Sequence, residues 1–200
     1  MAKIKPYAPE PLPLKKLNWA KLVPHLGETH AALALFNHSL KSFSSEKLEH
    51  LRWEESIHSL RSQGIRTRLK EMLQYIQTQS VKETRAPLLQ KVMNAQEGLE
   101  FAIGWAKRRP LSLSFLCHLH AIVKKDGPNP KEIGRIRERQ NWIGAEGCTL
   151  EEAYFYPPKH TLLKKYLKEL NRYSLKKEKD PLVQLAILFG QFLILSLIHI

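Results

Sequence analysis

The chain has 200 residues, of which 43% are apolar, enough to bury a core and to exclude disorder as its general state. Thirty-two Lys and Arg against nineteen Asp and Glu give a net charge of +13, so the folded surface should attract anions. Two cysteines, Cys117 and Cys148, cannot form a disulfide framework, and without a C-x-x-C spacing they suggest neither zinc nor a redox pair. We therefore expect a reducing, cytoplasmic compartment.

The N-terminal segment carries charges and four prolines between Pro6 and Pro13, where a secretory signal would need a continuous apolar stretch. Prolines at this density prevent a helix and favour an extended chain. The segment is interpreted as an arm laid across a folded body. A free ligand for a proline-reading domain is the other interpretation.

Helical patterns follow in chain order. The first covers residues 45–63, with Gly64 where a C′ glycine would end it, and the second covers 66–79. The third covers 85–107, and the apolar face that predicts its core contacts comprises Leu88, Leu89, Val92, Leu99, Ala102, Ile103 and Ala106.

A fourth helix is predicted from a cap at Ser112 or Ser114 to Lys125, where Asp126-Gly127-Pro128 is a stop signal. Periodicity then fails over 128–158, which has several glycines and aromatic residues and is interpreted as a loop or short β-hairpin. Helix returns over 161–173.

A last helix is predicted to start at Asp180-Pro181, as an N-cap followed by an N1 proline. The expected fold is all-α, with a proline-rich N-terminal arm and a short β-hairpin flap.

Residues 134–144 read GRIRERQNWIG, and residues 153–158 read AYFYPP. These segments resemble the Fic (Fic/DOC) family of protein adenylyltransferases, in which G-x-x-R-x-x-Q-N-W-I-G and A-x-F/Y-x-P-P flank a flap beside the active site. The resemblance implies a Fic-like helical bundle that binds ATP with Mg²⁺ and transfers AMP to a hydroxyl side chain of another protein.

In that family the flap backbone pairs with an extended segment of the target protein. The resemblance therefore implies a protein partner that docks on the flap. The expected docking residues are Gln140, Asn141, Trp142, Ile143, Gly144, Tyr154, Phe155, Tyr156, Pro157 and Pro158.

The resemblance also divides the chain into an N-terminal region, 1–80, and an incomplete core domain, 81–200. Many family members carry an inhibitory helix with [S/T]-x-x-x-E-G, which matches Ser59, Gln63 and Gly64 of the 45–64 segment. Gln63 replaces the glutamate and cannot make its charge-assisted pair with arginine. The segment is either a degenerate inhibitory motif or an ordinary helix end with a glycine cap.

The family's H-P-F-x-[D/E]-G-N-G-R motif, which supplies the base, the Mg²⁺ ligand and the phosphate cradle, does not occur in the 200 residues. Ser196 falls where the motif histidine belongs, and His199 fits only after a shift of three residues. We therefore expect no catalytic residue, no metal site and no cofactor in this chain, which is interpreted as a truncated and inactive Fic protein. A shifted reading frame or an early end would explain the divergence after Phe192.

His118 and His120 form H-x-H, but residues two apart on a helix point in different directions, so a shared metal is not expected. The basic clusters are dispersed and are interpreted as solvated surface, so nucleic acid is not expected as a partner. Trp142, Tyr154 and Tyr156 are interpreted as packing anchors of the flap, and stacking on a base is the other interpretation.

Residues 182–200 are predominantly apolar and reach the lower length range of a membrane span. We interpret them as a core helix that has lost its covering elements, which predicts self-association through 182–200. A tail-anchored membrane protein and a basic binding module are the alternative functions.

Overall fold

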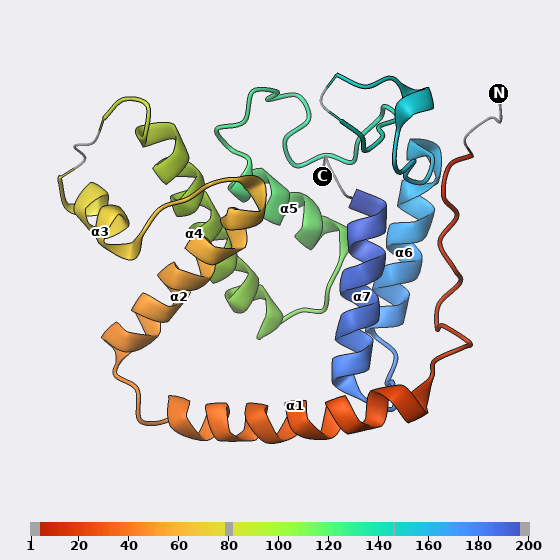
Figure 1. Cartoon of the computed structure of the whole chain (residues 1–200), viewed down its shortest axis with the longest axis horizontal. Helices are drawn as coiled ribbons and strands as arrows, with labels where there is room; N and C mark the ends of the chain where they lie inside the picture. The colour runs from red at the N-terminus through yellow and green to blue at the C-terminus, as the bar shows by residue number, and fades with distance from the viewer. Residues whose placement is uncertain (1–4, 79–81, 146, 197–200) are drawn as a thin grey trace. The chain divides into compact units, whose positions relative to one another are not determined.

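The computed structural model describes residues 5–78, 82–145 and 147–196 (Figure 1). Within these ranges α-helices dominate and no β-strand occurs, so the all-α prediction is confirmed. The chain forms two compact units. Unit 1 comprises residues 1–17, 105–121 and 127–200, and unit 2 comprises 18–104 and 122–126. The boundary predicted between residues 80 and 81 lies outside the described residues.

Unit 2 begins with α1 (Trp19–Leu40), a helix that was not predicted from the sequence. The side chain of Asn18 caps it by accepting a hydrogen bond from Lys21 N at 3.2 Å. Pro24 lies inside the helix, and no residue of α1 is buried.

The predicted 45–63 helix is present as α2 (Ser45–Ser59), which continues into the 3₁₀ turn η1 (Leu60–Gln63). Gly64 follows with φ 77°, and its N–H bonds to the carbonyls of Leu60 and Arg61. The predicted C′ glycine is therefore confirmed, because this left-handed conformation suits a residue without a Cβ.

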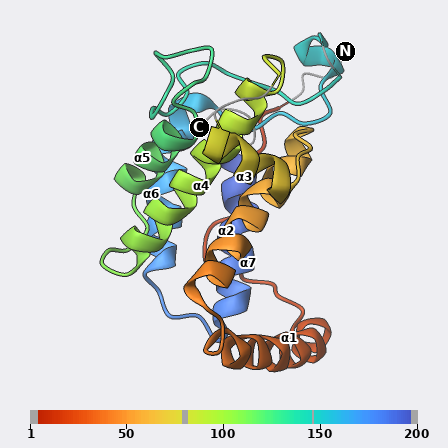
Figure 2. The ribbon, with the colours of Figure 1, turned by 90° about the vertical axis from the view of Figure 1, so that its left-hand side faces the viewer.

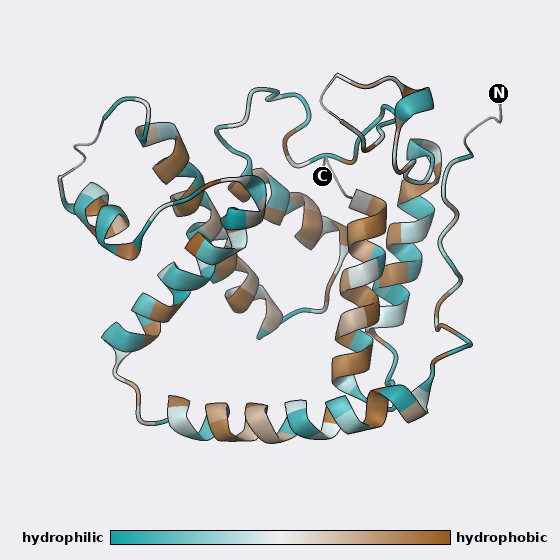
Figure 3. Ribbon diagram, in the orientation of Figure 1, coloured by the Kyte–Doolittle hydropathy of each residue, from teal (hydrophilic) through white to brown (hydrophobic). Residues whose placement is uncertain are grey.

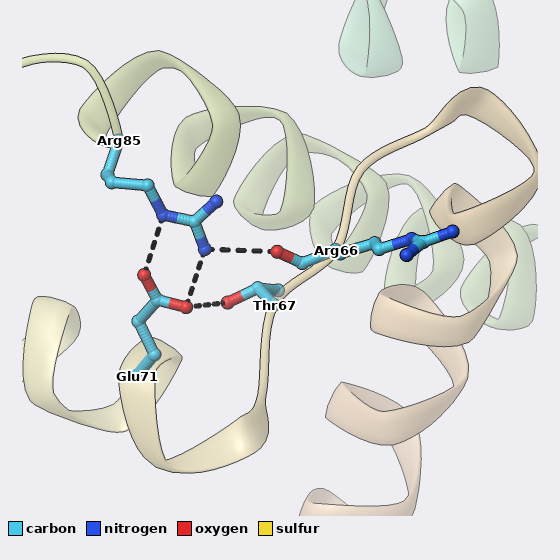
Figure 4. Close-up of polar contacts among 4 residues, drawn as sticks. All are labelled: Arg66, Thr67, Glu71 and Arg85. Atoms are coloured by element: carbon cyan, nitrogen blue, oxygen red, sulfur yellow. Dashed lines mark hydrogen bonds and ion pairs between the residues drawn. The ribbon is translucent and has the colours of Figure 1, made fainter.

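Two further helices, α3 (Leu69–Thr78) and α4 (Ala86–Ala106), complete the core of unit 2 (Figure 2). Glu71 of α3 bonds to Arg85, the residue before α4 (Figure 4). The buried apolar cluster of this unit comprises Ile57, Leu60, Ile65, Met72, Tyr75, Leu89 and Val92.

The buried face of α4 is more polar than predicted. Asn94 and Gln96 are buried, and Ala106, which was predicted to face the core, is exposed. Gln96 Oε1 accepts a hydrogen bond from Ser56 at 2.8 Å, and Asn94 Nδ2 donates to Asp126 at 2.8 Å. These pairings satisfy polar groups that would otherwise destabilise the interior.

Unit 1 contains most of α5 (Leu113–Val123). Of the two predicted caps, Ser112 is the one that caps this helix, because its hydroxyl accepts a hydrogen bond from Phe115 N at 3.1 Å. Two 3₁₀ turns follow, η2 (Leu150–Glu152) and η3 (His160–Leu162).

The unit ends with α6 (Leu163–Ser174) and α7 (Pro181–Ser196), which run antiparallel and side by side (Figure 1). Asp180 accepts hydrogen bonds from the N–H groups of Leu182 and Val183 at 2.8 and 3.4 Å, which confirms the predicted cap. Hydrophobic residues predominate along α7, whereas hydrophilic and hydrophobic residues alternate on α6 (Figure 3). One buried cluster of the unit comprises Leu163, Leu167 and Leu195, with Leu113, Leu116, Ile136 and Tyr166 packed against it.

Candidate protein-docking flap

Residues 140–158 of unit 1, called the flap below, double back at one antiparallel bridge between Ile143 and Phe155. Ile143 N donates to Phe155 O at 2.9 Å, and Phe155 N donates to Ile143 O at 3.1 Å. Ile143 O also accepts from Tyr154 N at 2.7 Å. The described residues thus hold the two arms together at one bridge and form no strand, and the longer β-hairpin stays a prediction.

Gln140 joins the two ends of the flap at its base. Its Nε2 donates to Pro157 O at 3.1 Å, and its Oε1 accepts from His160 N at 3.3 Å. Arg137 adds a hydrogen bond from Nη2 to Pro158 O at 2.7 Å. Pro157 and Pro158 are themselves fully buried, so the flap stands on a packed base.

Three buried polar atoms at this base, Arg137 Nε, Asn141 Oδ1 and His160 Nδ1, have no hydrogen-bond partner among the residues described. Burial lowers the pKa of the Arg137 guanidinium, and the nearby Tyr156 acts in the opposite direction. Because an arginine stays protonated at any ordinary pH, Arg137 remains a donor to the base.

Above the base, two aromatic side chains face solvent. Tyr154 is 80% exposed and Trp142 is 37% exposed, while Tyr156 is half-buried. The prediction of a packing anchor is therefore wrong for Tyr154, whose side chain is mostly exposed to solvent. Trp142 Nε1 donates to Cys148 O at 3.1 Å, which fixes the indole while leaving part of its face open.

Position 144 needs a glycine because the side chain of Cys148 leaves no room for a Cβ there. A Cβ at this position would lie 2.3 Å from the Sγ of Cys148, far inside van der Waals contact. Cys148 has no disulfide partner, and its side chain fills the space above Gly144. The turn between the two arms is therefore closely packed at this point.

The two arms of the flap have different outer edges. Successive residues of an extended chain direct their N–H and C=O groups to opposite sides, so Ile143 faces Phe155 while Trp142 and Gly144 face outward. No backbone group of Trp142 or Gly144 makes a hydrogen bond within the described ranges. We call this side the open edge.

The opposite side is occupied. Tyr156 O accepts a hydrogen bond from Tyr7 N at 2.8 Å, and the rings of Tyr7 and Phe155 lie 5.7 Å apart between centroids. The predicted arm therefore does lie on the folded body, within unit 1. Tyr7 was not predicted as a flap contact, although an aromatic residue between Pro6 and Pro9 was a usable signal.

The other predicted site residues lie elsewhere. Ser59, Gln63 and Gly64 belong to unit 2, where Ser59 donates to Glu55 at 3.1 Å and Gln63 is exposed. Ser196 is the last residue of α7, and His199 lies outside the described residues.

The two histidines of the H-x-H motif make separate local contacts. His118 Nδ1 lies 2.7 Å from Ser114 O, and His120 Nδ1 accepts a hydrogen bond from Gly134 N at 2.9 Å. Across the residues described, no group of three or more His, Cys, Asp or Glu side chains is placed to hold a metal ion.

No protein-family model and no curated protein matches this chain. Among the helices described, none is long and apolar enough to span a membrane.

Proposed function

We propose that the chain belongs to the Fic family and that its flap binds an extended segment of a target protein. Support comes from the agreement between residues 134–144 and 153–158 and the two family sequence runs. The observation that carries the proposal is the open edge, where the backbone of Trp142 and Gly144 has no hydrogen bond to a described residue, on an arm that the bridge and the Gln140 base hold in place.

An extended segment would bind by β-strand addition, which uses main-chain hydrogen bonds for affinity and side-chain contacts for selectivity. The outward groups of Trp142 and Gly144 supply the hydrogen bonds. The exposed rings of Trp142 and Tyr154 supply apolar contact, because aromatic residues contribute strongly to interfaces at low conformational cost. A docked segment would pair with the 142–144 arm on the side opposite Phe155 and would form a third extended segment beside the bridge.

The family reaction transfers AMP from ATP, with Mg²⁺, to a hydroxyl of the docked target. The residues present do not fit these groups: no cluster of carboxylates and histidines is placed for a metal in the described ranges, and the 200 residues contain no H-P-F-x-[D/E]-G-N-G-R loop. We derive no transfer step for this polypeptide, which we propose binds a target segment without transferring AMP.

The test is selection of linear peptides from a displayed random library, followed by NMR titration of the full chain labelled with ¹⁵N. Peptides that dock on the open edge should shift the amides of Trp142 and Gly144. Trp142→Pro removes the outward N–H and should weaken their binding at least tenfold. Trp142→Phe is the matched control, since it keeps the N–H and should retain most of the affinity. Selected peptides that shift no flap amide would disprove the proposal.

A catalytic readout separates docking from chemistry. When the chain is incubated with ATP, Mg²⁺ and a selected peptide that contains a hydroxyl, mass spectrometry should find no AMP adduct. An adduct on the peptide would show that the 200 residues suffice for transfer and would overturn the inactive assignment.

A second candidate function, a basic binding module, is favoured by the outer face of α6. Lys164, Lys168 and Arg172 are exposed at intervals of four residues, opposite the buried Leu163, Leu167 and Leu170. None of the three cations forms an ion pair with a described residue. Binding of a short DNA duplex that weakens steeply with salt, and weakens again in Lys164→Gln/Lys168→Gln, would support this candidate.

A further inference from the structure

The arm contact at Tyr156 occupies the edge of the flap that the proposed function does not use. Phe155 directs its N–H and C=O toward Ile143, whereas Tyr156 O is directed to the other side and bonds to Tyr7 N at 2.8 Å. The 154–156 segment thus lies between the 143 arm and the N-terminal arm. On one side it bonds to Ile143 of the flap, and on the other side it bonds to Tyr7 of the N-terminal arm.

We propose that the Tyr156 edge is a second binding site for extended peptides, and that the N-terminal arm is its resident, displaceable occupant. The partner that fits is an extended segment with an aromatic residue at the place of Tyr7. Its backbone N–H would bond to Tyr156 O, and its ring would lie against Phe155. This site is separate from the open edge and does not depend on the proposed function.

The arm fills this edge incompletely. Its described residues make one backbone hydrogen bond to Tyr156, and Tyr7 is still 40% exposed. Pro9 lies two residues beyond Tyr7, on the same side of an extended chain, and has no N–H with which to continue the pairing. A peptide without that proline offers a backbone N–H that the arm lacks at this position, so we expect it to bind more tightly than a peptide with the arm sequence.

The arm has one advantage, which is its attachment to the same chain. A tethered segment acts at an effective concentration of about millimolar, so a free copy of the arm sequence should compete only at that concentration or above. Prolines at positions 6 and 9 also keep the arm extended before it binds, which reduces the entropy lost on docking. A competing partner must therefore gain its advantage from additional contacts.

Two synthetic peptides test the site by NMR titration of the full ¹⁵N-labelled chain. One is the arm sequence Lys-Pro-Tyr-Ala-Pro-Glu, residues 5–10, and the other carries valine in place of the second proline. Both should shift the amides of Phe155 and Tyr156. The valine peptide should bind roughly three- to tenfold more tightly, the gain expected from about one added hydrogen bond.

The matched variants of the chain are Tyr7→Ala, which removes the ring of the resident arm, and Tyr7→Phe, which keeps it. Tyr7→Ala should lower the peptide concentration at half-saturation by roughly three- to tenfold, and Tyr7→Phe should leave it unchanged. Equal midpoints in the wild-type chain and Tyr7→Ala would disprove resident occupancy. Shifts that avoid Phe155 and Tyr156 would disprove the site itself.

The outcomes remain distinct from those of the open edge. If the selected peptides do not shift the amides of Trp142 and Gly144, the titration of the chain and its Tyr7 variants with the arm peptides still tests the second site. That titration needs neither a target protein nor AMP transfer. A result in which the arm peptide shifts Trp142 and Gly144 instead of Tyr156 would show that one edge serves both, and would overturn the second site.

Discussion

Arg85 binds both carboxylate oxygens of Glu71, from Nε to Oε1 at 2.8 Å and from Nη2 to Oε2 at 2.6 Å (Figure 4). Thr67 donates to the same carboxylate at 2.5 Å, and Arg85 Nη2 also donates to the carbonyl of Arg66 at 3.0 Å. The pair therefore ties three parts of unit 2 together: the turn before α3, α3 itself and the start of α4.

Glu71→Gln should destabilise unit 2 by about 1–2 kcal/mol, because paired, charge-assisted hydrogen bonds contribute more than single neutral ones. Chemical denaturation followed by circular dichroism would measure the loss. The matched control is Glu97→Gln, which breaks a more exposed pair with Lys125 and should cost no more than about 0.5 kcal/mol. Equal losses in both variants would contradict a special role for the Arg85 pairing.

The same pair predicts a dependence on pH. The hydrogen bond from Arg85 is the main reason that the pKa of Glu71 lies below its usual value of 4.5. Burial raises this pKa, and the hydrogen bond from Thr67 lowers it further. A carboxyl whose pKa is depressed by folding stabilises the fold above its unfolded pKa, and this contribution disappears as the pH falls below about 4.5. Denaturation series of the wild type and Glu71→Gln should therefore converge in acid and diverge toward neutral pH.

Tyr173 of α6 predicts a change at the other end of the pH scale. Burial, followed by the carboxylate of Glu178, raises the pKa of Tyr173 to about 12. Since the unfolded phenol ionises near pH 10 and the folded one near 12, the fold keeps its full stability below pH 10 and loses part of it as the pH rises toward 12. Tyrosinate absorbance should show one phenol titrating late, and Tyr173→Phe should remove that step.

The hydroxyl of Tyr173 is buried, and apart from the neighbouring Glu178 carboxylate it has no hydrogen-bond partner in the described part of the chain. Removing it in Tyr173→Phe should therefore change stability at neutral pH by less than about 1 kcal/mol, because at most one weak hydrogen bond is lost. A loss above about 1 kcal/mol would show that the hydroxyl has a partner that matters.

Gly144→Ala should loosen the flap, since the new methyl group would collide with Cys148 Sγ at 2.3 Å. Amide exchange at Ile143 and Phe155 should accelerate. Cys148→Ala in the same chain removes the colliding sulfur and should restore slow exchange. Gly104→Ala is the control, because nothing lies within 4 Å of its added Cβ and replacing a glycine within α4 should stabilise by about 0.5–1 kcal/mol.

The predicted self-association has a specific surface to test on α7, where Leu185, Phe189 and Leu193 follow one another at intervals of four residues and are 62%, 62% and 38% exposed. Phe189→Ser should shift sedimentation profiles toward the monomer, because it removes the largest exposed ring of the row. Ala186→Ser, on the same exposed side, should change little. A chain that is monomeric at all concentrations would contradict the proposal.

Sequence patterns predicted the elements whose signals are local. The glycine after η1, the Ser112 cap of α5 and the Asp180-Pro181 start of α7 each depend on a few adjacent residues, and each is present. The helix α1 was missed because Pro24 and Gly27 interrupt its pattern and because no buried face gives it an apolar period. Burial of Asn94 and Gln96 could not be predicted either, since it depends on partners 32 and 40 residues away.

The features of the flap were likewise predictable where they depend on adjacent residues and unpredictable where they depend on distant ones. The flap residues were predicted from a continuous sequence pattern, and the structure brings Ile143 and Phe155 into a bridge. Exposure of Tyr154 was mispredicted because an aromatic residue in an irregular segment carries no period that shows which way it points. The contact between Tyr7 and Tyr156 joins residues that lie far apart in the sequence, and no local rule could have paired them.

The order of the segments has a consequence for synthesis on the ribosome. Unit 2 uses residues 18–104 and 122–126, all of which are translated before residue 127, whereas unit 1 combines residues 1–17 with 105–121 and 127–200. Because domains generally fold as their chain emerges, unit 2 can fold first while the N-terminal arm waits for Tyr156 to be translated. Nascent chains stalled beyond residue 126 should already protect α2 to α4 from protease, with the arm still open to cleavage.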